Sequence, residues 1–169
     1  SYFSLCIQNN KVIRLNNINL ITSDLNINAQ AKITGISKGT SKITAVIDLI
    51  NSDLSIPHLN WRKLSGSAGR LRVAADIQNS KLIKLRTINL VAADLNLDAK
   101  ADFHEQTGRV KNIIINNLSV GDSEMGGTIL LNDNGHYHAK LKGKKINLNR
   151  FISGNNQSPD AEKIKFSVA

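Results

Sequence analysis

Residues 77–90 read IQNSKLIKLRTINL, and residues 7–20, seventy positions earlier, read IQNNKVIRLNNINL. The match continues without a gap over residues 7–33 and 77–103, where 14 of 27 positions are identical. The chain is rich in Asn, Ile, Leu and Lys, which raises the rate of chance matches. Compositional bias alone does not hold one ungapped offset over so long a segment, however. We interpret the pair as an internal repeat, which is typical of stacked or extended units.

Both copies alternate apolar and polar residues. A period of two places the apolar set on one face of a β-sheet. Turn signals separate such runs, and the sequence NDNG at residues 132–135 is a strong hairpin signal. The alternation slips by one position between Leu90 and Leu95, which predicts a tight turn or bulge at Ala93 and Asp94, and likewise at residues 23–24. The candidate lining residues of the apolar face are Leu25, Ile27, Ala29, Ala31, Leu95, Leu97, Ala99, Ala101 and Phe103.

Helix signals are few. The clearest is Ser158 followed by Pro159, an N-cap and first-turn pair that could begin a short terminal helix. We therefore predict an all-β fold of roughly ten short antiparallel strands. Residues 1–152 form the repeated β-segment, and residues 153–169 form a linker that continues as a short helix or a strand.

The composition favours a folded, basic chain. Apolar residues make up 41% of the sequence, aromatic residues only 4%, and 22 Lys and Arg against 13 Asp and Glu give 22 − 13 = +9. With Cys6 as the single cysteine, no internal disulfide can form. No apolar run approaches the ~20 residues that a membrane helix needs. The opening SYFSLC has neither an initiator Met nor a signal-like pattern, so we expect an excised piece whose export signal or anchor lies elsewhere.

An antiparallel sheet with one apolar face must cover that face, and no adequate helix is available in the sequence. The sheet can pack on a second sheet, close into a barrel, or curl into a trough that holds an apolar guest. The small residues at Ala29, Ala31, Ala99 and Ala101 leave room for a guest. Small residues are also common in tightly packed sandwiches, so these alternatives stay open.

Residues 48–63, DLINSDLSIPHLNWRK, resemble a segment of AsmA-like proteins of the YhdP type. Pro57, Leu59, Trp61 and Lys63 fall on marked positions of that pattern, while Asn60 stands where a Gly is usual. Residues 108–152 are similar to the family's run of Gly-led strands and hairpins, and the whole resemblance covers roughly residues 40–152.

The resemblance implies a curved, elongated β-groove within an inner-membrane-anchored periplasmic protein of a Gram-negative bacterium. Its partners would be phospholipid and the inner and outer membranes, with acyl chains carried along the groove toward the outer membrane. The alternative is a structural β-solenoid or stalk repeat of a surface or secreted protein.

No residue pattern indicates a catalytic site, a metal site or a cofactor, and we do not expect an enzyme. His136 and His138 share one strand face and could bind a metal, but a solvated hairpin end is the simpler interpretation. Trp61 is interpreted either as an anchor at a membrane interface or as a ring packed under the sheet edge. The basic residues are scattered and aromatic platforms are scarce, so we expect no nucleic-acid partner. Attraction to anionic lipid and a generally solvated surface are the remaining interpretations.

Overall fold

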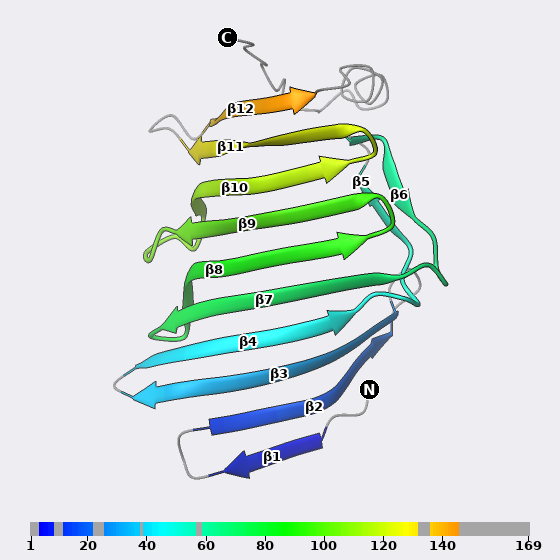
Figure 1. Ribbon diagram of the computed structural model, residues 1–169. Helices are drawn as coiled ribbons and strands as arrows, with labels where there is room; N and C mark the ends of the chain where they lie inside the picture. The colour runs from blue at the N-terminus through cyan, green and yellow to red at the C-terminus, as the bar shows by residue number, and fades with distance from the viewer. Residues whose placement is uncertain are drawn as a thin grey trace.

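The computed structural model describes residues 4–8, 12–21, 26–37, 39–56, 59–131 and 136–145. These residues form an antiparallel all-β fold (Figure 1), which confirms the predicted fold class. The strands are longer than expected, mostly nine to twelve residues. They are β1 (Ser4–Gln8), β2 (Val12–Ile21), β3 (Asn26–Ser37), β4 (Thr40–Asp48), β5 (Leu54–Ile56), β6 (Trp61–Lys63), β7 (Gly69–Gln78), β8 (Lys81–Ala92), β9 (Leu95–Phe103), β10 (Val110–Val120), β11 (Ser123–Leu131) and β12 (Tyr137–Lys145).

Ten of these strands form one sheet in the order β1-β2-β3-β4-β7-β8-β9-β10-β11-β12. Each strand pairs antiparallel with its neighbour, so the sheet is a meander with two ends, β1 and β12. The strands β5 and β6 leave the sheet between β4 and β7 and pair only with each other, as a hairpin at one end of the long strands (Figure 1). The described strands therefore form an open sheet with one small hairpin beside it.

Local sequence explains the strands and the turns between them. In β4 the side chains alternate between exposed and half-buried at every position from Thr40 to Asp48, as period-two burial requires. The β7–β8 turn places Asn79 at φ 48° and Ser80 at φ 63°. Two successive positive φ values are the geometry of a tight hairpin turn, in which Asn is favoured. Polar residues at these positions are thus the local reason why β7 and β8 pair.

The two similar segments, residues 7–33 and 77–103, pair with the same register. Leu15 lies opposite Ala31 in β2–β3, and Leu85 lies opposite Ala101 in β8–β9, seventy positions on. Both ladders are then interrupted, and pairing resumes at Ile18 and at Ile88. An extra residue at this point is a β-bulge, which bends the strand and resets its alternation.

The predicted turn at Ala93 and Asp94 is present, between β8 and β9, with Ala93 at φ 52°. Several other predictions fall outside the described residues. These are the turn at residues 23–24, the hairpin tip at residues 132–135, and the linker and terminal helix of residues 153–169. The strands on either side of residues 132–135 do pair antiparallel, with Leu131 opposite Tyr137. Within the described part of the chain, no helix has the length and apolar character needed to cross a membrane.

The buried core lies where the β5–β6 hairpin meets one end of the sheet. Trp61 is 4% exposed and packs in one cluster with residues of β8 to β11. Asn60, immediately before it, takes φ 45°, a left-handed conformation that Gly and Asn adopt more readily than other residues. The other buried members of the cluster are Ala92, Leu95, Leu118, Val120 and Met125.

Candidate functional site

One face of the sheet carries three uninterrupted apolar rows that run across the strands from β2 to β12. The residues of a row lie opposite one another in successive strand pairs. The first row is Ile18, Ala29, Ile47, Leu71, Leu90, Leu97, Leu118, Met125 and Gly143. The second row is Leu15, Ala31, Ala45, Val73, Ile88, Ala99, Ile115, Gly127 and Leu141. The third row is Ile13, Ile33, Ile43, Ala75, Leu85, Ala101, Ile113, Ile129 and Ala139.

Three bulges keep these rows on one face. In β2 and β10 the first and second rows are three residues apart rather than two, as Ile115 and Leu118 are. In β8 the second and third rows are three residues apart, because the ladder shifts between Leu85 and Ile88. A separation of three would turn one of the two side chains to the opposite face of a regular strand. The bulges restore the common face, so the spacing I-x-x-L or L-x-x-I inside a strand is a signal that period-two analysis misses.

The structure places most of the predicted lining residues on this face. Ala29, Ala31, Leu97, Ala99 and Ala101 belong to the rows. Leu95 lies on the same face, two positions beyond Leu97, within the buried cluster under the hairpin at 2% exposure. Ile27 and Phe103 lie at the ends of β3 and β9, beyond the rows, and Leu25 is outside the described residues. The sequence therefore identified part of the face, whereas the contributions of β4, β7, β10, β11 and β12 extend it.

The β5–β6 hairpin covers one end of this face. We call the buried cluster around Trp61 the covered end. The Trp61 indole Nε1 donates a hydrogen bond to Oδ1 of Asp94, in the β8–β9 turn, at 3.0 Å. A ring that is 4% exposed and fastened to the sheet has little surface to offer to a membrane. This position fits the packing interpretation of Trp61 better than the membrane-interface interpretation.

Lys63 holds the base of the hairpin. Its side chain is fully buried, and its Nζ donates to the carbonyl oxygens of Ser52 at 3.0 Å and Leu64 at 3.1 Å, with that of Ile50 at 3.4 Å. Three carbonyl acceptors match the three N–H donors of an ammonium group. The close approach needs Gly69, because a Cβ there would lie 2.5 Å from Lys63 Cε. Both Trp61 and Lys63 thus have structural roles here.

A second part of the rows, away from the hairpin cluster, forms the open stretch, which we define as the second- and third-row residues of β3, β4 and β7. In the described part of the chain only the β5–β6 hairpin lies outside the main sheet, and none of these residues packs in its cluster. Most of them are half-buried, although Ala75 is only 5% exposed. A small side chain on a pleated sheet is shielded by taller neighbours, so low exposure here does not require a second layer. The open stretch comprises Ala31, Ile33, Ile43, Ala45, Val73 and Ala75.

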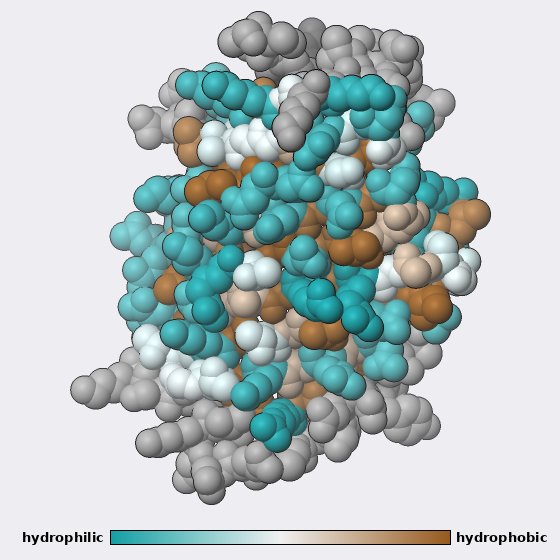
Figure 2. Space-filling model, in the orientation of Figure 1, coloured by the Kyte–Doolittle hydropathy of each residue, from teal (hydrophilic) through white to brown (hydrophobic). Residues whose placement is uncertain are grey.

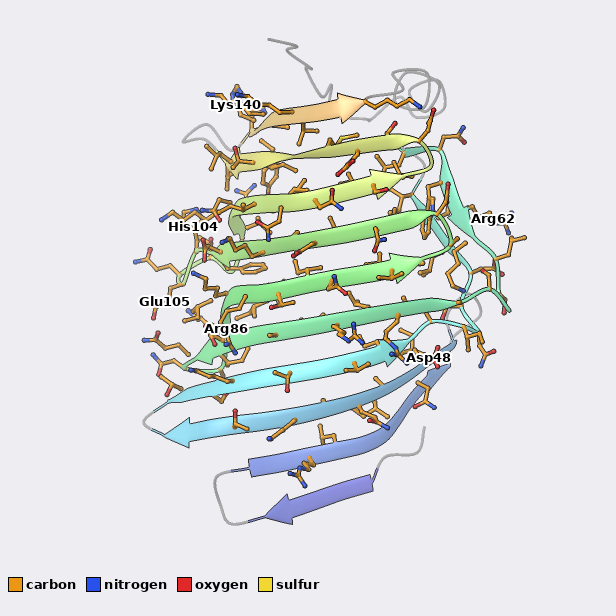
Figure 3. The ribbon with its side chains drawn as sticks, viewed as in Figure 1. Asp48, Arg62, Arg86, His104, Glu105 and Lys140 are labelled. Carbon is orange, nitrogen blue, oxygen red and sulfur yellow. The ribbon has the colours of Figure 1, made fainter. Side chains whose placement is uncertain are left out.

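The opposite face is polar, and the view in Figure 2 is largely hydrophilic with scattered apolar patches. His136 and His138 are both exposed, and the described residues contain no group of three His, Cys, Asp or Glu side chains placed to hold a metal. Figure 3 shows His104 and Glu105 near the β9–β10 loop, at the end of the sheet away from the hairpin. A comparison of the chain with protein-family models, curated proteins and solved structures gives no match.

Proposed function

We propose that this chain is a lipid-carrying segment in which the three apolar rows hold acyl chains. The observation that carries the proposal is the absence of any charged or hydrogen-bonding side chain from the three described rows, on every strand of the main sheet from β2 to β12. Burying apolar surface is worth about 25 cal/mol per Å² whatever supplies the cover. An acyl chain supplies cover without any polar contact, so the rows need no specific site.

The rows give such a track a direction. They run across the strands, so an acyl chain lying along them crosses from one hydrogen-bonded strand to the next. Neighbouring strands lie about 4.8 Å apart, and the ten strands of the sheet therefore span about 43 Å. That distance exceeds the ~30 Å thickness of a bilayer's hydrocarbon core. The hairpin would form one wall of the track, since it lies over one end of the strands.

The finer proposal is a curved β-groove built from an internal repeat. It is supported by the shared register of β2–β3 and β8–β9, including the bulge that follows Leu15 and Leu85. Together with the resemblance of residues 48–63 and 108–152 to AsmA-like proteins of the YhdP type, this supports a periplasmic part of an inner-membrane-anchored protein. Phospholipid moving toward the outer membrane is the proposed cargo.

The proposal is tested by native mass spectrometry of the purified protein and by a matched pair of variants. Ala99→Asp with Ala101→Asp places two carboxylates in the second and third rows, where they would block an acyl chain. Ala99 and Ala101 are 2% and 4% exposed, but neither packs in the cluster under the hairpin, so we expect the fold to survive. Bound phospholipid and lipid crosslinking should be lost.

The control is Asn96→Asp with Lys100→Gln, on the polar face of the same strand. It also lowers the net charge by two, since each change contributes −1. We expect it to retain lipid. Should the row variant unfold, with no lipid recovered from the wild-type protein, the face is an ordinary core and the lipid proposal fails. A structural repeat would then be the better account.

A further inference from the structure

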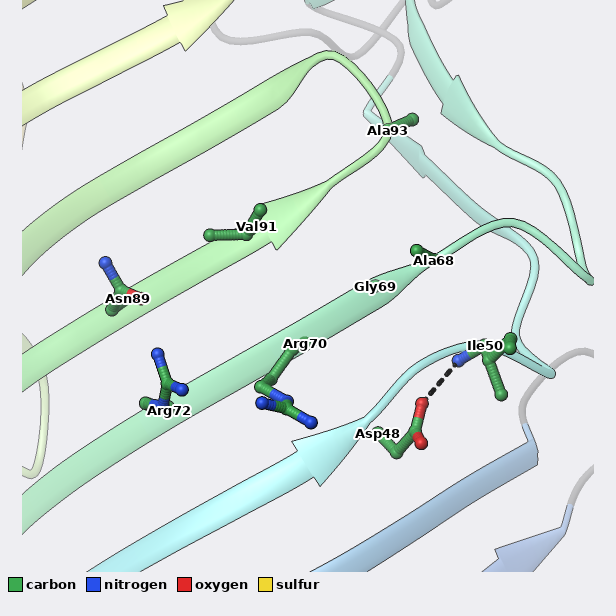
Figure 4. Close-up of a pocket in the computed structure, with 9 residues that line it drawn as sticks. All are labelled: Asp48, Ile50, Ala68, Gly69, Arg70, Arg72, Asn89, Val91 and Ala93. Atoms are coloured by element: carbon green, nitrogen blue, oxygen red, sulfur yellow. Dashed lines mark hydrogen bonds between the residues drawn. The ribbon is translucent and has the colours of Figure 1, made fainter.

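The polar face of the sheet carries a depression beside the point where the chain leaves β4 to form the β5–β6 hairpin. It has a volume of about 530 Å³ and lies where β4, β7 and β8 run side by side (Figure 4). Small residues at Ala68, Gly69 and Ala93 leave the space open. The depression is on the sheet face opposite the apolar rows, because Arg70 and Arg72 alternate with Leu71 along β7. The remaining lining residues are Asp48, Ile50, Arg70, Arg72, Asn89 and Val91.

Two guanidinium groups dominate the charge of this depression. Arg70 and Arg72 are exposed, and among the described residues neither forms an ion pair. Asn89 lies directly opposite Arg72 in the β7–β8 ladder and adds an amide to the same wall. Two Arg side chains two positions apart on a strand point to the same side and can converge on one anion.

Two other cations on this face are paired. Lys84 Nζ lies 3.2 Å from Asp102 Oδ1, and Arg86 Nε lies 2.9 Å from Asp76 Oδ1. The second contact is an ion pair rather than an aligned hydrogen bond, since Asp76 Oδ1 has no hydrogen-bond partner of adequate geometry. Arg70 and Arg72 differ from these two cations because no carboxylate among the described residues pairs with them, so both guanidinium groups are available to a ligand in the depression.

Asp48 and two aliphatic side chains complete the wall. Asp48 Oδ1 already accepts a hydrogen bond from the backbone N–H of Ile50 at 2.9 Å (Figure 4). The formal charge of the lining is 2 − 1 = +1, from Arg70 and Arg72 against Asp48. Ile50 and Val91 are 43% and 44% exposed, although both are large aliphatic residues. The lining therefore combines forked cationic donors with apolar surface.

We propose that this depression binds a phosphate ester, with Arg70 and Arg72 holding the phosphate oxygens and Ile50 and Val91 contacting an adjoining apolar group. A guanidinium presents parallel N–H donors that match two oxygens of one phosphate, which gives Arg an advantage over Lys. The ester is either the headgroup of a lipid or a soluble phosphate compound. The site lies on the other face from the acyl rows, so it does not depend on the function proposed above.

The test is isothermal titration calorimetry of the protein with three probes. These are inorganic phosphate, glycerol 3-phosphate and a short-chain phosphatidic acid below its micelle concentration. A fourth measurement uses flotation with vesicles of phosphatidylcholine containing phosphatidylglycerol. We expect Arg70→Gln with Arg72→Gln to weaken binding about tenfold for each guanidinium removed, since a hydrogen bond to a charged group is worth about that factor.

Three further variants make the test specific. Lys32→Gln with Lys42→Gln removes the same charge from exposed positions of β3 and β4 outside the depression, and we expect nearly unchanged affinity. Asp48→Asn keeps an oxygen acceptor for the Ile50 N–H while removing the opposing charge, and we expect tighter binding. Arg70→Lys with Arg72→Lys keeps both charges without the fork, and we expect an intermediate loss. Circular dichroism and thermal unfolding confirm that each variant is folded.

The outcomes separate the sources of the phosphate. Arginine-dependent binding of the short-chain lipid and of vesicles, without binding of glycerol 3-phosphate, identifies a lipid headgroup. Arginine-dependent binding of glycerol 3-phosphate, with an affinity equal to that of the short-chain lipid, identifies a soluble ester. The proposal is overturned if no probe binds, if both double Gln variants lose affinity equally, or if duplex DNA binds more tightly than every probe. The Ala99→Asp, Ala101→Asp variant changes only the opposite face of the sheet. Native mass spectrometry of that variant therefore tests the acyl track separately from the phosphate site.

Discussion

The covered end and the open stretch carry the same kind of sequence but have different surroundings. At the covered end, Ala92, Leu95, Val120 and Met125 are at most 3% exposed beneath the β5–β6 hairpin. In the open stretch, Ile43, Ala45 and Val73 on β4 and β7 are half-buried, with no described segment packed over them. Alternation of apolar residues thus determines which face is apolar and leaves open whether that face is covered. The difference should appear in stability, because substitutions in the covered end remove packing that the open stretch never had.

The largest effect is expected from Trp61→Ala at the covered end. Removing a buried Trp should cost about 3–5 kcal/mol in the free energy of unfolding, through lost packing and the cavity left behind. The Asp94 carboxylate also loses the indole donor that lies 3.0 Å away. Urea denaturation measures the change. Arg62→Ala on the same strand is the control, because its ion pair with Asp53 is exposed at 3.8 Å and should contribute under about 1 kcal/mol. Equal losses from the two variants would contradict the described packing.

Placing a charge in each of the two regions tests the difference between them most directly. Ala92→Asp puts a carboxylate at a position that is 1% exposed under the hairpin, and we expect a loss of about 3 kcal/mol from its desolvation. Ala45→Asp puts the same group in the open stretch, where the side chain can reach water, so the loss should be under about 1 kcal/mol. Thermal unfolding of both variants at neutral pH provides the measurement. A loss at Ala45 as large as that at Ala92 would mean that the open stretch is covered in solution.

Replacing the buried Lys63 should have a smaller effect. Lys63→Met keeps the approximate length of the side chain but leaves three carbonyl oxygens without their donor. We expect a loss of about 2 kcal/mol, within the range for unsatisfied buried acceptors. Lys42→Met, at an exposed position of β4, is the matched control and should be nearly neutral. Chemical denaturation reports the difference, and a Lys63 variant as stable as the wild-type protein would show that the ammonium group does not stabilise the hairpin.

The smallest effect is expected on the polar face, where ion pairs meet solvent. Arg86→Ala removes the contact with Asp76 at 2.9 Å, and we expect a loss of about 0.5 kcal/mol that diminishes with added salt. Thermal unfolding at low and high ionic strength measures it. A loss that is large and independent of salt would instead assign a packing role to the Arg86 side chain.

The sequence predicted the fold class and part of the apolar face because strand alternation is a local signal. Leu97, Ala99 and Ala101 could be assigned to one face from their own segment. The hairpin cover could not be assigned in the same way, since β5 and β6 are only three residues each. Burial of Lys63 depends on three carbonyl oxygens that fold around it, and a lysine in a sequence gives no indication of that environment. The bulges were missed because each hides inside one long strand.

The number of strands between the two similar segments, residues 7–33 and 77–103, has a consequence for the width of the sheet. From Leu15 to Leu85 the chain passes through four strands of the sheet, β2, β3, β4 and β7, before β8 begins. Because this number is even in an antiparallel sheet, β8 runs in the same direction as β2. At about 4.8 Å per strand, seventy residues lengthen the sheet by about 19 Å. Adding or deleting four strands together would change the width of the sheet across its strands, without changing which side is apolar or at which end a hairpin can lie.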